Sequence, residues 1–347
     1  MKKFYSFIFL LNLVALASAQ TTVEISQGAS YADDVYVSMS EGEVSTTDGT
    51  NWDLAFEATS AFSIGIRIND GHGTLLKSYP NGDVEDWDNV DTTGYSGWSQ
   101  LNNRIDLWSN GAFNISQVGG GSDFSWGYYT GDPLHDVVGD SIYIVSTIEG
   151  AVKKLRLDLL DGGEWTFTHA NLDGSDEVQE TFNITEYPNK NFAYYSLDDS
   201  AFANREPEGA EWDMVFTRYF TMTAFGPGAT AGVFMNRGVE MIQADGVDVN
   251  TVLYTDYTWT THEENISVIG NDWKSLNDMF MWEVVADRAY FVKDQEGDIY
   301  KVIFLTFEGS QTGNASYTSE LITGASVEEL FAKDLVAFPN PISIKTI

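Results

Sequence analysis

Short runs of apolar and β-branched residues recur along the chain, with turn-forming residues between them. Clear runs occupy residues 141–146, 154–160, 165–169, 289–293 and 299–307. They are rich in Val, Ile, Thr, Phe, Tyr and Trp, the residues that favour strands. Asp-Gly and Asn-Gly pairs, which favour tight turns, recur between runs. Because long helical periodicity is almost absent, the pattern predicts an all-β fold.

Two parts of the chain repeat each other. Residues 126–158 align without a gap on residues 273–305, at an offset of 147 (273 minus 126). Upstream, residues 52–56 align on residues 212–216, at an offset of 160 (212 minus 52). Copy one is therefore about thirteen residues longer between the two motifs. A duplicated unit predicts two tandem homologous β-rich domains.

The first repeated motif has the alternation of a strand. Trp52, Leu54 and Phe56 are two residues apart and would share one face, which predicts a core strand with an aromatic anchor. Asp53 would then point away, toward turns or water. The second copy repeats this arrangement around Asp213.

The second repeated motif predicts a hairpin and a core residue. Gly150 and Gly297 each follow a Glu where the chain must reverse, and glycine tolerates the positive φ of such a turn. A lysine begins each return strand, and we expect its stem to pack while its ammonium stays exposed. These lysines are Lys154 and Lys301. The match of Trp126 with Trp273 predicts a place in the core for both.

The first nineteen residues have the organisation of a cleaved secretory signal. Met1-Lys2-Lys3 is basic, residues 4–16 are apolar, and residues 17–19 are small, which predicts cleavage after Ala19. The apolar run is too short to span a bilayer, and no other run is longer, so we expect no transmembrane segment. The protein is thus expected to be exported, either secreted or at the cell surface (outer membrane).

Composition narrows the function. The chain of 347 residues has 52 acidic and 18 basic residues, a net charge of −34. Such a surface repels phosphates, so we expect no nucleic-acid binding and no binding to membranes through a basic patch. Without cysteine, disulfides and thiol chemistry are excluded. Zinc spacings, a nucleophile elbow, a phosphate loop and a dinucleotide fingerprint are all missing, so we predict no enzyme activity and no catalytic residue.

The repeated motifs resemble those of a known family. The Trp-Asp-Leu/Met-x-Phe motif, followed by Tyr-x-Val, Glu-Gly and Lys in a hairpin, is similar to the HmuY family of secreted haem-binding proteins from Bacteroidota. Copy two shows the hairpin in residues 290–304, and copy one shows it in residues 143–157. The resemblance implies two HmuY-like β domains, haem as the cofactor, and a role in iron acquisition.

The expected organisation has four parts. Residues 1–19 are the signal peptide, residues 20–185 are copy one, and residues 186–324 are copy two. Residues 325–347 would be a linker, with a short helix at 326–333, and the start of a further domain. Phe338-Pro339-Asn340-Pro341 resembles the opening of the sorting domain of type IX secretion cargo, here truncated. That resemblance implies the type IX secretion machinery as a partner where the sorting domain is complete.

The family resemblance implies that two His or Met side chains bind the haem iron from opposite faces. In copy two, His262 lies in a polar loop and is followed by Met279 and Met281. In copy one, His72 lies in a Gly-rich loop. No histidine repeats between the copies, and no other metal ligand is predicted. The same residues also have structural interpretations, since Met beside Phe280 is typical of core packing.

Two other functions remain open at this stage. One is a surface interaction or adhesion module that has lost haem ligation and binds a surface protein. The other is carbohydrate binding, for which Trp126 and Tyr128 form one aromatic patch. Haem binding needs His or Met facing a cleft. Adhesion needs exposed apolar patches without a pocket, and glycan binding needs exposed aromatic side chains near polar groups.

Overall fold

The computed structural model describes residues 20–115, 121–131, 133, 135–223 and 225–323. As predicted, the chain is all-β, and the described strands pair in antiparallel fashion. The helical elements described are short 3₁₀ helices: η1 (Ala29–Tyr31), η2 (Val84–Asn89), η3 (Tyr95–Gly97), η4 (Ala112–Asn114), η5 (Ile184–Glu186), η6 (Gly209–Glu211), η7 (Tyr254–Asp256) and η8 (Gly309–Gln311).

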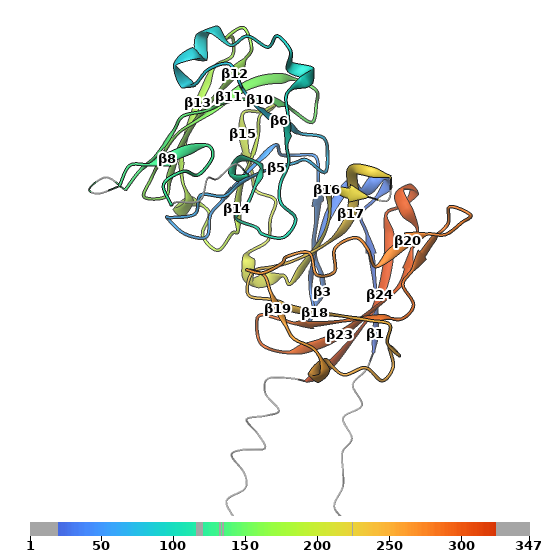
Figure 1. Ribbon diagram of the computed structural model, residues 1–347. Coiled ribbons are helices and arrows are strands. Elements are labelled where there is room, and N and C mark those ends of the chain that lie inside the picture. The colour runs from blue at the N-terminus through green and yellow to red at the C-terminus, as the bar shows by residue number, and fades with distance from the viewer. Residues whose placement is uncertain (1–19, 116–120, 132, 134, 224, 324–347) are drawn as a thin grey trace, which may run out of the picture.

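The strands form two halves, which we call half A and half B (Figure 1). Half A, the upper one, contains β4 (Leu54–Glu57), β5 (Ile66–Ile68), β6 (Leu75–Ser78), β7 (Gln100–Leu101), β8 (Gly127–Tyr129), β9 (Val137–Gly139), β10 (Ile142–Ser146), β11 (Val152–Asp161), β12 (Glu164–Asn171), β13 (Val178–Asn183), β14 (Phe192–Ser196) and β15 (Ala201–Ala203).

Half B, the lower one in Figure 1, takes strands from both ends of the described chain. It contains β1 (Thr21–Ser26), β2 (Asp33–Ser38), β3 (Gly42–Asp48), β16 (Met214–Thr223), β17 (Gly226–Met235), β18 (Glu240–Asp245), β19 (Thr260–Thr261), β20 (Lys274–Leu276), β21 (Trp282–Val284), β22 (Arg288–Lys293), β23 (Ile299–Phe307) and β24 (Asn314–Thr323).

Each half is a sandwich of two sheets, and the two halves have the same strand order. Half A has the paths β13-β12-β11-β10-β6-β7 and β15-β14-β4-β5. Half B has the paths β1-β24-β23-β22-β18-β19 and β3-β2-β16-β17. The strands β1 to β3 of half B therefore occupy the places that β13 to β15 occupy in half A.

The boundary predicted between residues 185 and 186 does not separate the sheets. It falls between β13 and β14, both of which belong to half A. Strand β14 pairs with β4, with Tyr195 opposite Leu54, while β2 pairs with β16, with Val37 opposite Met214. Half A is thus one continuous segment that interrupts half B. The first three strands of copy one, β1 to β3, belong to half B, so the sequence repeat and the two sandwiches have different boundaries.

A large aromatic core lies between the sheets of each half. In half A, Phe56 packs against Trp165 and Phe167, and Trp126 is buried beside Trp165. In half B, Trp273 stacks on Phe304 with ring centres 3.9 Å apart. The prediction that Trp126 and Trp273 are core residues is confirmed.

The strand runs and turns predicted from the sequence are also confirmed. The five apolar runs lie in β10, β11, β12, β22 and β23, and the last matches β23 residue for residue. Gly150 and Gly297 have φ of 92° and 91°, so each hairpin reverses on a conformation that other residues adopt only with strain. The helix expected at 326–333 lies outside the described residues.

The two motif aspartates differ from the prediction, because both are buried. Asp53 is 2% exposed and accepts hydrogen bonds from the amide of Leu197 (2.9 Å) and the hydroxyl of Thr74 (3.0 Å). Asp213 is 4% exposed and accepts from the amide of Met39 at 2.7 Å. Leu197 follows β14 and Met39 follows β2, so each aspartate holds the equivalent hairpin of its own half.

The predicted exposure of the two lysines is also wrong. Lys154 is buried, its Nζ donates to the Trp87 carbonyl at 2.6 Å, and it lies 4.5 Å from the centre of the Trp87 ring. Lys301 is buried as well. The local sequence predicts that both lysines begin a return strand, but it does not show which distant segments bury them. Lys154 is buried by η2, which contains Trp87.

The first motif tryptophan lies outside the strand. Strand β4 begins at Leu54, and Trp52 packs edge-on against Tyr194 near the contact between the halves. Trp212 packs edge-on against Tyr36 in the same way. Trp52 is therefore an aromatic packing residue as predicted, but it packs near the junction and not on the core face with Leu54 and Phe56.

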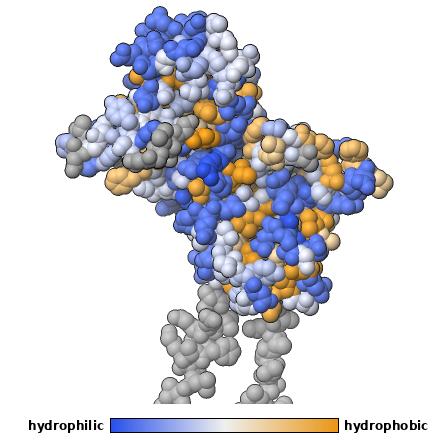
Figure 2. All heavy atoms as spheres, viewed as in Figure 1, coloured by the Kyte–Doolittle hydropathy of each residue, from blue (hydrophilic) through white to orange (hydrophobic). Residues whose placement is uncertain are grey.

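Hydrogen bonds and an ion pair join the halves. The indole Nε1 of Trp108 donates to the Met235 carbonyl at 2.9 Å, and the Asn191 amide donates to Asn236 Oδ1 at 2.8 Å. Arg237 pairs with Glu57 across the junction. Figure 2 shows hydrophobic residues gathered along this junction and over half B, whereas the top of half A is mostly hydrophilic. Within the described ranges, no helix is long and apolar enough to cross a bilayer.

Candidate functional site

Two of the predicted ligand residues lie at the tip of the hairpin formed by β20 and β21. Met279, Phe280 and Met281 are 77%, 76% and 62% exposed. We call these three residues the apolar tip. The hairpin projects from half B near the β20 label in Figure 1. Three adjacent apolar side chains this exposed are unusual on a protein surface, which makes the tip a candidate contact site.

The apolar tip is held rigidly by Asn277. The side-chain oxygen of Asn277 accepts from the amides of Met279 (2.9 Å) and Met281 (3.0 Å), and its amide group donates to Glu283. Phe280 has a φ of 59°, a left-handed conformation that a bulky residue rarely adopts. Since the hydrogen bonds of Asn277 stabilise this strained turn, the tip is preorganised.

The corresponding hairpin of half A also extends outward, near the β8 label in Figure 1, but its pairing differs. Strands β8 and β9 follow Trp126 as β20 and β21 follow Trp273, but β9 pairs with β11 and so joins the large sheet. In half B, β20 and β21 form a separate two-stranded sheet. The same repeated hairpin is therefore paired to the large sheet in one half and is a separate sheet in the other.

His262, the third candidate, already has partners for both ring nitrogens. Nδ1 accepts from the Gly238 amide at 3.0 Å, and Nε2 lies 3.1 Å from a carboxylate oxygen of Glu263. Burial lowers the pKa of His262, and Glu263 partly offsets this effect. His262 follows β19, which lies on the opposite side of half B from β20 in Figure 1.

His72, the fourth candidate, packs against the backbone that follows β3 of half B. Its ring lies over Gly49, where a Cβ atom would stand 2.5 Å from Nε2. This nitrogen is buried and has no hydrogen-bond partner among the described residues. Burial also lowers the pKa of His72, which favours the neutral ring. The structure brings Met279 and Met281 together on one hairpin but places His262 and His72 elsewhere.

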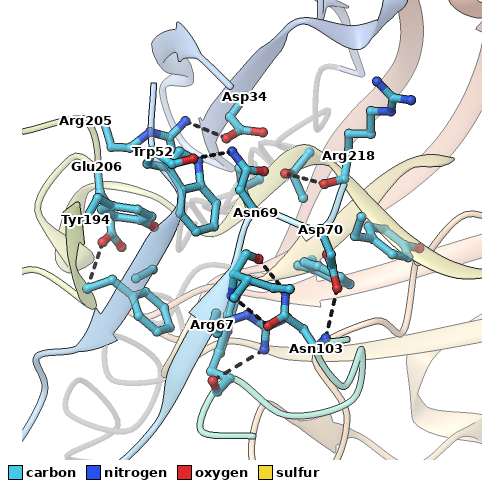
Figure 3. Close-up of a pocket in the computed structure, with 18 of the residues that line it drawn as sticks. Asp34, Trp52, Arg67, Asn69, Asp70, Asn103, Tyr194, Arg205, Glu206 and Arg218 are labelled. Carbon is cyan, nitrogen blue, oxygen red and sulfur yellow. Dashed lines mark hydrogen bonds and ion pairs between the residues drawn. The ribbon is translucent and has the colours of Figure 1, made fainter. Parts of the chain in front are cut away.

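A small chamber lies where the halves meet, and no sequence motif predicted it (Figure 3). Its volume is about 60 Å³, room for a few water molecules and far below the 300 to 1,000 Å³ typical of ligand pockets. Arg205 pairs with Asp34 at 2.6 Å, and both side chains are buried. In Figure 3 this pair meets beside Trp52, while the guanidinium of Arg218 points away.

The chamber contains acids whose titration is shifted by burial. Burial raises the pKa of Glu206 to about 7, although hydrogen bonding from the Phe192 amide and the charge of Arg205 oppose the shift. Burial likewise raises the pKa of Asp70 to about 6, opposed by its hydrogen bond from the Asn103 amide. Asp70 is also hydrogen-bonded by the backbone of Phe220 in half B, and the charges of both acids depend on pH near neutrality.

Several chamber atoms have no hydrogen-bond partner in the described part of the chain. They are Asp34 Oδ1, Trp52 Nε1 and Trp212 Nε1. Arg67, in contrast, donates to the carbonyls of Leu107 (2.9 Å) and Arg104 (3.0 Å). One feature of the sequence points to the chamber. Arg67 lies between Ile66 and Ile68 on the buried strand β5. A charge in that position needs buried partners.

No protein-family model matches this chain, and no curated protein matches it. Among solved structures, the chain is similar to apo PinO from Porphyromonas gingivitis, with 10% identity and a TM-score of 0.31. The match covers 89% of this chain and 100% of that chain. A likeness of this size carries no inference about fold or function, so membership of the HmuY family stays a prediction from the sequence motifs.

Proposed function

We propose that this protein is an exported binding module without catalytic activity, and that the apolar tip on β20–β21 inserts into a pocket of a protein partner. The observation that carries the proposal is the preorganised exposure of Met279, Phe280 and Met281. Buried apolar and aromatic anchors supply most of the energy of protein interfaces. An anchor already held in its bound conformation loses little entropy on binding.

The charges around the tip favour a protein over a lipid surface. Asp278 and Glu283 flank the three apolar residues and are exposed, in a chain of net charge −34. Anionic head groups would repel them. A pocket with an apolar floor and a basic rim complements both features, so association should slow as ionic strength rises.

Haem binding, implied by the family resemblance, is the weaker proposal. The four candidate ligands belong to three separate places, and none of them lines the chamber between the halves. The ring nitrogens of His262 are engaged, and His72 lies against the backbone. Adhesion requires only an exposed apolar patch without a pocket, which is the arrangement at the tip.

The test is site-specific photo-crosslinking. A photoreactive phenylalanine analogue replaces Phe280 in one variant and Phe62, which is 82% exposed on half A, in the control. Both are incubated with membranes and culture medium of the source organism. We expect a discrete crosslinked species from position 280 alone. Excess unlabelled wild type should compete it away, and a Met279→Ser/Met281→Ser variant should not.

Three results would overturn the proposal. The first is equal crosslinking from positions 280 and 62, and the second is competition by the serine variant as strong as that by wild type. The third is a saturable shift of the haem absorption spectrum to a sharp low-spin form that the Met279→Ser/Met281→Ser variant loses. That last result would assign the tip to haem instead.

A further inference from the structure

An open cleft of about 590 Å³ lies on the junction, beside the small chamber. Half A contributes the loop after β7, and half B contributes β16, the start of β17 and the loop after β19. The residues that line it are Asn102, Asn103, Arg104, Ile105, Asp106, Phe220, Thr221, Met222, Pro227, Asn265 and Ser267. Its volume lies within the range typical of small-ligand sites, which often form between domains.

The two walls of the cleft are tied together. The amide of Ile266 in half B donates to the Asp106 carbonyl of half A at 2.8 Å. Asn103 is held by β5, since its side-chain amide donates to the Ile68 carbonyl and its oxygen accepts from the Ile68 amide. Asn265 Oδ1 accepts from the amide and the hydroxyl of Ser267, both at 2.9 Å. The cleft is therefore preformed.

The cleft is electrically neutral in a strongly acidic protein. Its charged lining residues are Arg104 and Asp106, which pair through Nε and Oδ1 at 2.9 Å. Their opposite charges cancel within the site. A cationic ligand would find no unpaired carboxylate in this lining, and an anionic ligand would be repelled by the chain as a whole. The paired charges in the cleft and the acidic surface around it therefore favour a neutral ligand.

The lining combines an apolar wall with unused polar groups. Ile105, Phe220 and Pro227 supply the apolar surface. The side-chain N–H groups of Asn102 and Asn265 donate to no acceptor among the described residues, because their hydrogen bonds use only the side-chain oxygens. A pyranose ring has the matching chemistry, with an apolar face and hydroxyl groups at its edge.

We infer that the cleft binds a neutral oligosaccharide. The apolar wall contacts the ring faces, and the amides of Asn102 and Asn265 donate to hydroxyl oxygens. The paired Arg104 and Asp106 offer a donor and an acceptor side by side, which suits adjacent hydroxyl groups. This site is separate from the apolar tip and does not depend on the protein partner proposed above.

Isothermal titration calorimetry of the chain from Gln20 to Ile347 tests this inference. The probes are neutral hexasaccharides of glucose, mannose and xylose, with a galacturonic acid hexamer as the anionic comparison. We expect saturable binding of at least one neutral probe. Asn265→Asp keeps the oxygen that Ser267 needs but removes the free donor, so it should weaken binding about tenfold or more.

Controls separate a lost contact from a lost fold. Asn250→Ala changes an exposed asparagine in a turn of half B, away from the cleft lining, and should bind as the wild type does. The Met279→Ser/Met281→Ser variant should also bind the oligosaccharide normally. The inference is overturned if no neutral probe binds, if Asn265→Asp binds as tightly as wild type, or if the galacturonic acid hexamer binds best.

Discussion

Half A and half B have the same sandwich, yet the chain builds them differently. Half A is formed by one uninterrupted run of strands, β4 to β15. Half B closes only when β1, β2 and β3, from the beginning of the described chain, pair with β24 and β16 from its end. The repeated sequence supplies both halves with equivalent strands: β1 to β3 complete half B, and β13 to β15 take the same places in half A.

Both halves are stabilised by the same contacts, although the strands of half B are not continuous in the chain. Asn69 donates to the carbonyls of Gly49 and Trp52, and Asn236 donates to those of Gly209 and Trp212. The same asparagine thus holds the same tryptophan loop in each half. What differs is the periphery, where β8–β9 joins the large sheet and β20–β21 forms a separate two-stranded sheet. The proposed contact site lies where the halves depart from each other.

The largest expected effect comes from removing residues 1–49, which deletes β1 to β3. Half B would lose Ile25, Val35 and Val37 from its core, each worth roughly 1.5–3 kcal/mol, against a total stability of about 5–15 kcal/mol. We expect half B to unfold and half A to remain. Hydrogen exchange should then show lost protection in β16 and β24 and retained protection in β10 to β12.

A peptide of residues 20–49 added to this truncated chain is the matched control, and it should restore protection in β24. Persistent protection of β16 and β24 without the peptide would show that half B does not need the N-terminal strands. Loss of protection in β10 to β12 would show instead that the halves fold as one unit.

The two buried aspartates allow a finer comparison. Asp53→Ala leaves the amides of Leu197 and Ile148 without an acceptor, and Asp213→Ala does the same to the amide of Met39. Each change should lower the free energy of unfolding by about 1–3 kcal/mol, measured by urea titration. Hydrogen exchange should rise around β14–β15 in the first variant and around β2–β3 in the second.

An Asp53→Ala variant that loosens β2–β3 as much as β14–β15 would contradict the view that each aspartate acts within its own half. The conservative changes Asp53→Asn and Asp213→Asn serve as controls. They keep one acceptor oxygen and should lose less stability than the alanine variants.

An effect confined to high pH is expected from Glu206, at the crossing from half A to half B. The ordinary glutamate pKa is 4.5, and burial raises that of Glu206 to about 7. The native state therefore holds this proton more tightly than the unfolded state, so the contribution of Glu206 to stability falls as pH rises from about 4.5 to about 7. Glu206→Gln should increase stability at pH 8 by on the order of 2 kcal/mol and leave it unchanged at pH 4.

Urea midpoints of wild type and Glu206→Gln at both pH values test this expectation. Burial raises the pKa of Asp70 and of Asp213 to about 6. In the variant, both groups still make the folded state less stable as pH rises. The pH dependence of the free energy of unfolding should therefore be weaker in Glu206→Gln than in the wild type, but still present. Equal losses of stability between pH 4 and pH 8 in both proteins would mean that Glu206 is not protonated in the native state.

Much of the local structure could be predicted from the sequence. Strand β23 was predicted with its full extent, and the turns at Gly150 and Gly297 follow from the need for positive φ. The candidate site was predicted only in part. Residue type alone suggests Met279 and Met281 as iron ligands, whereas their exposure follows from their place at the tip of β20–β21, a hairpin that pairs with no larger sheet.

The all-β class, the repeated unit and the positions of strands and turns can be predicted from the sequence. These properties depend on neighbours in the chain, through alternation of side chains and the backbone freedom of glycine. The three-dimensional fold is needed to learn which half receives β1 to β3, that Asp53 and Lys154 are buried, and that a cleft forms on the junction. Both copies carry equivalent strands, so β2 and β14 could pair with either sheet by pattern alone, and the choice depends on contacts between distant parts of the chain.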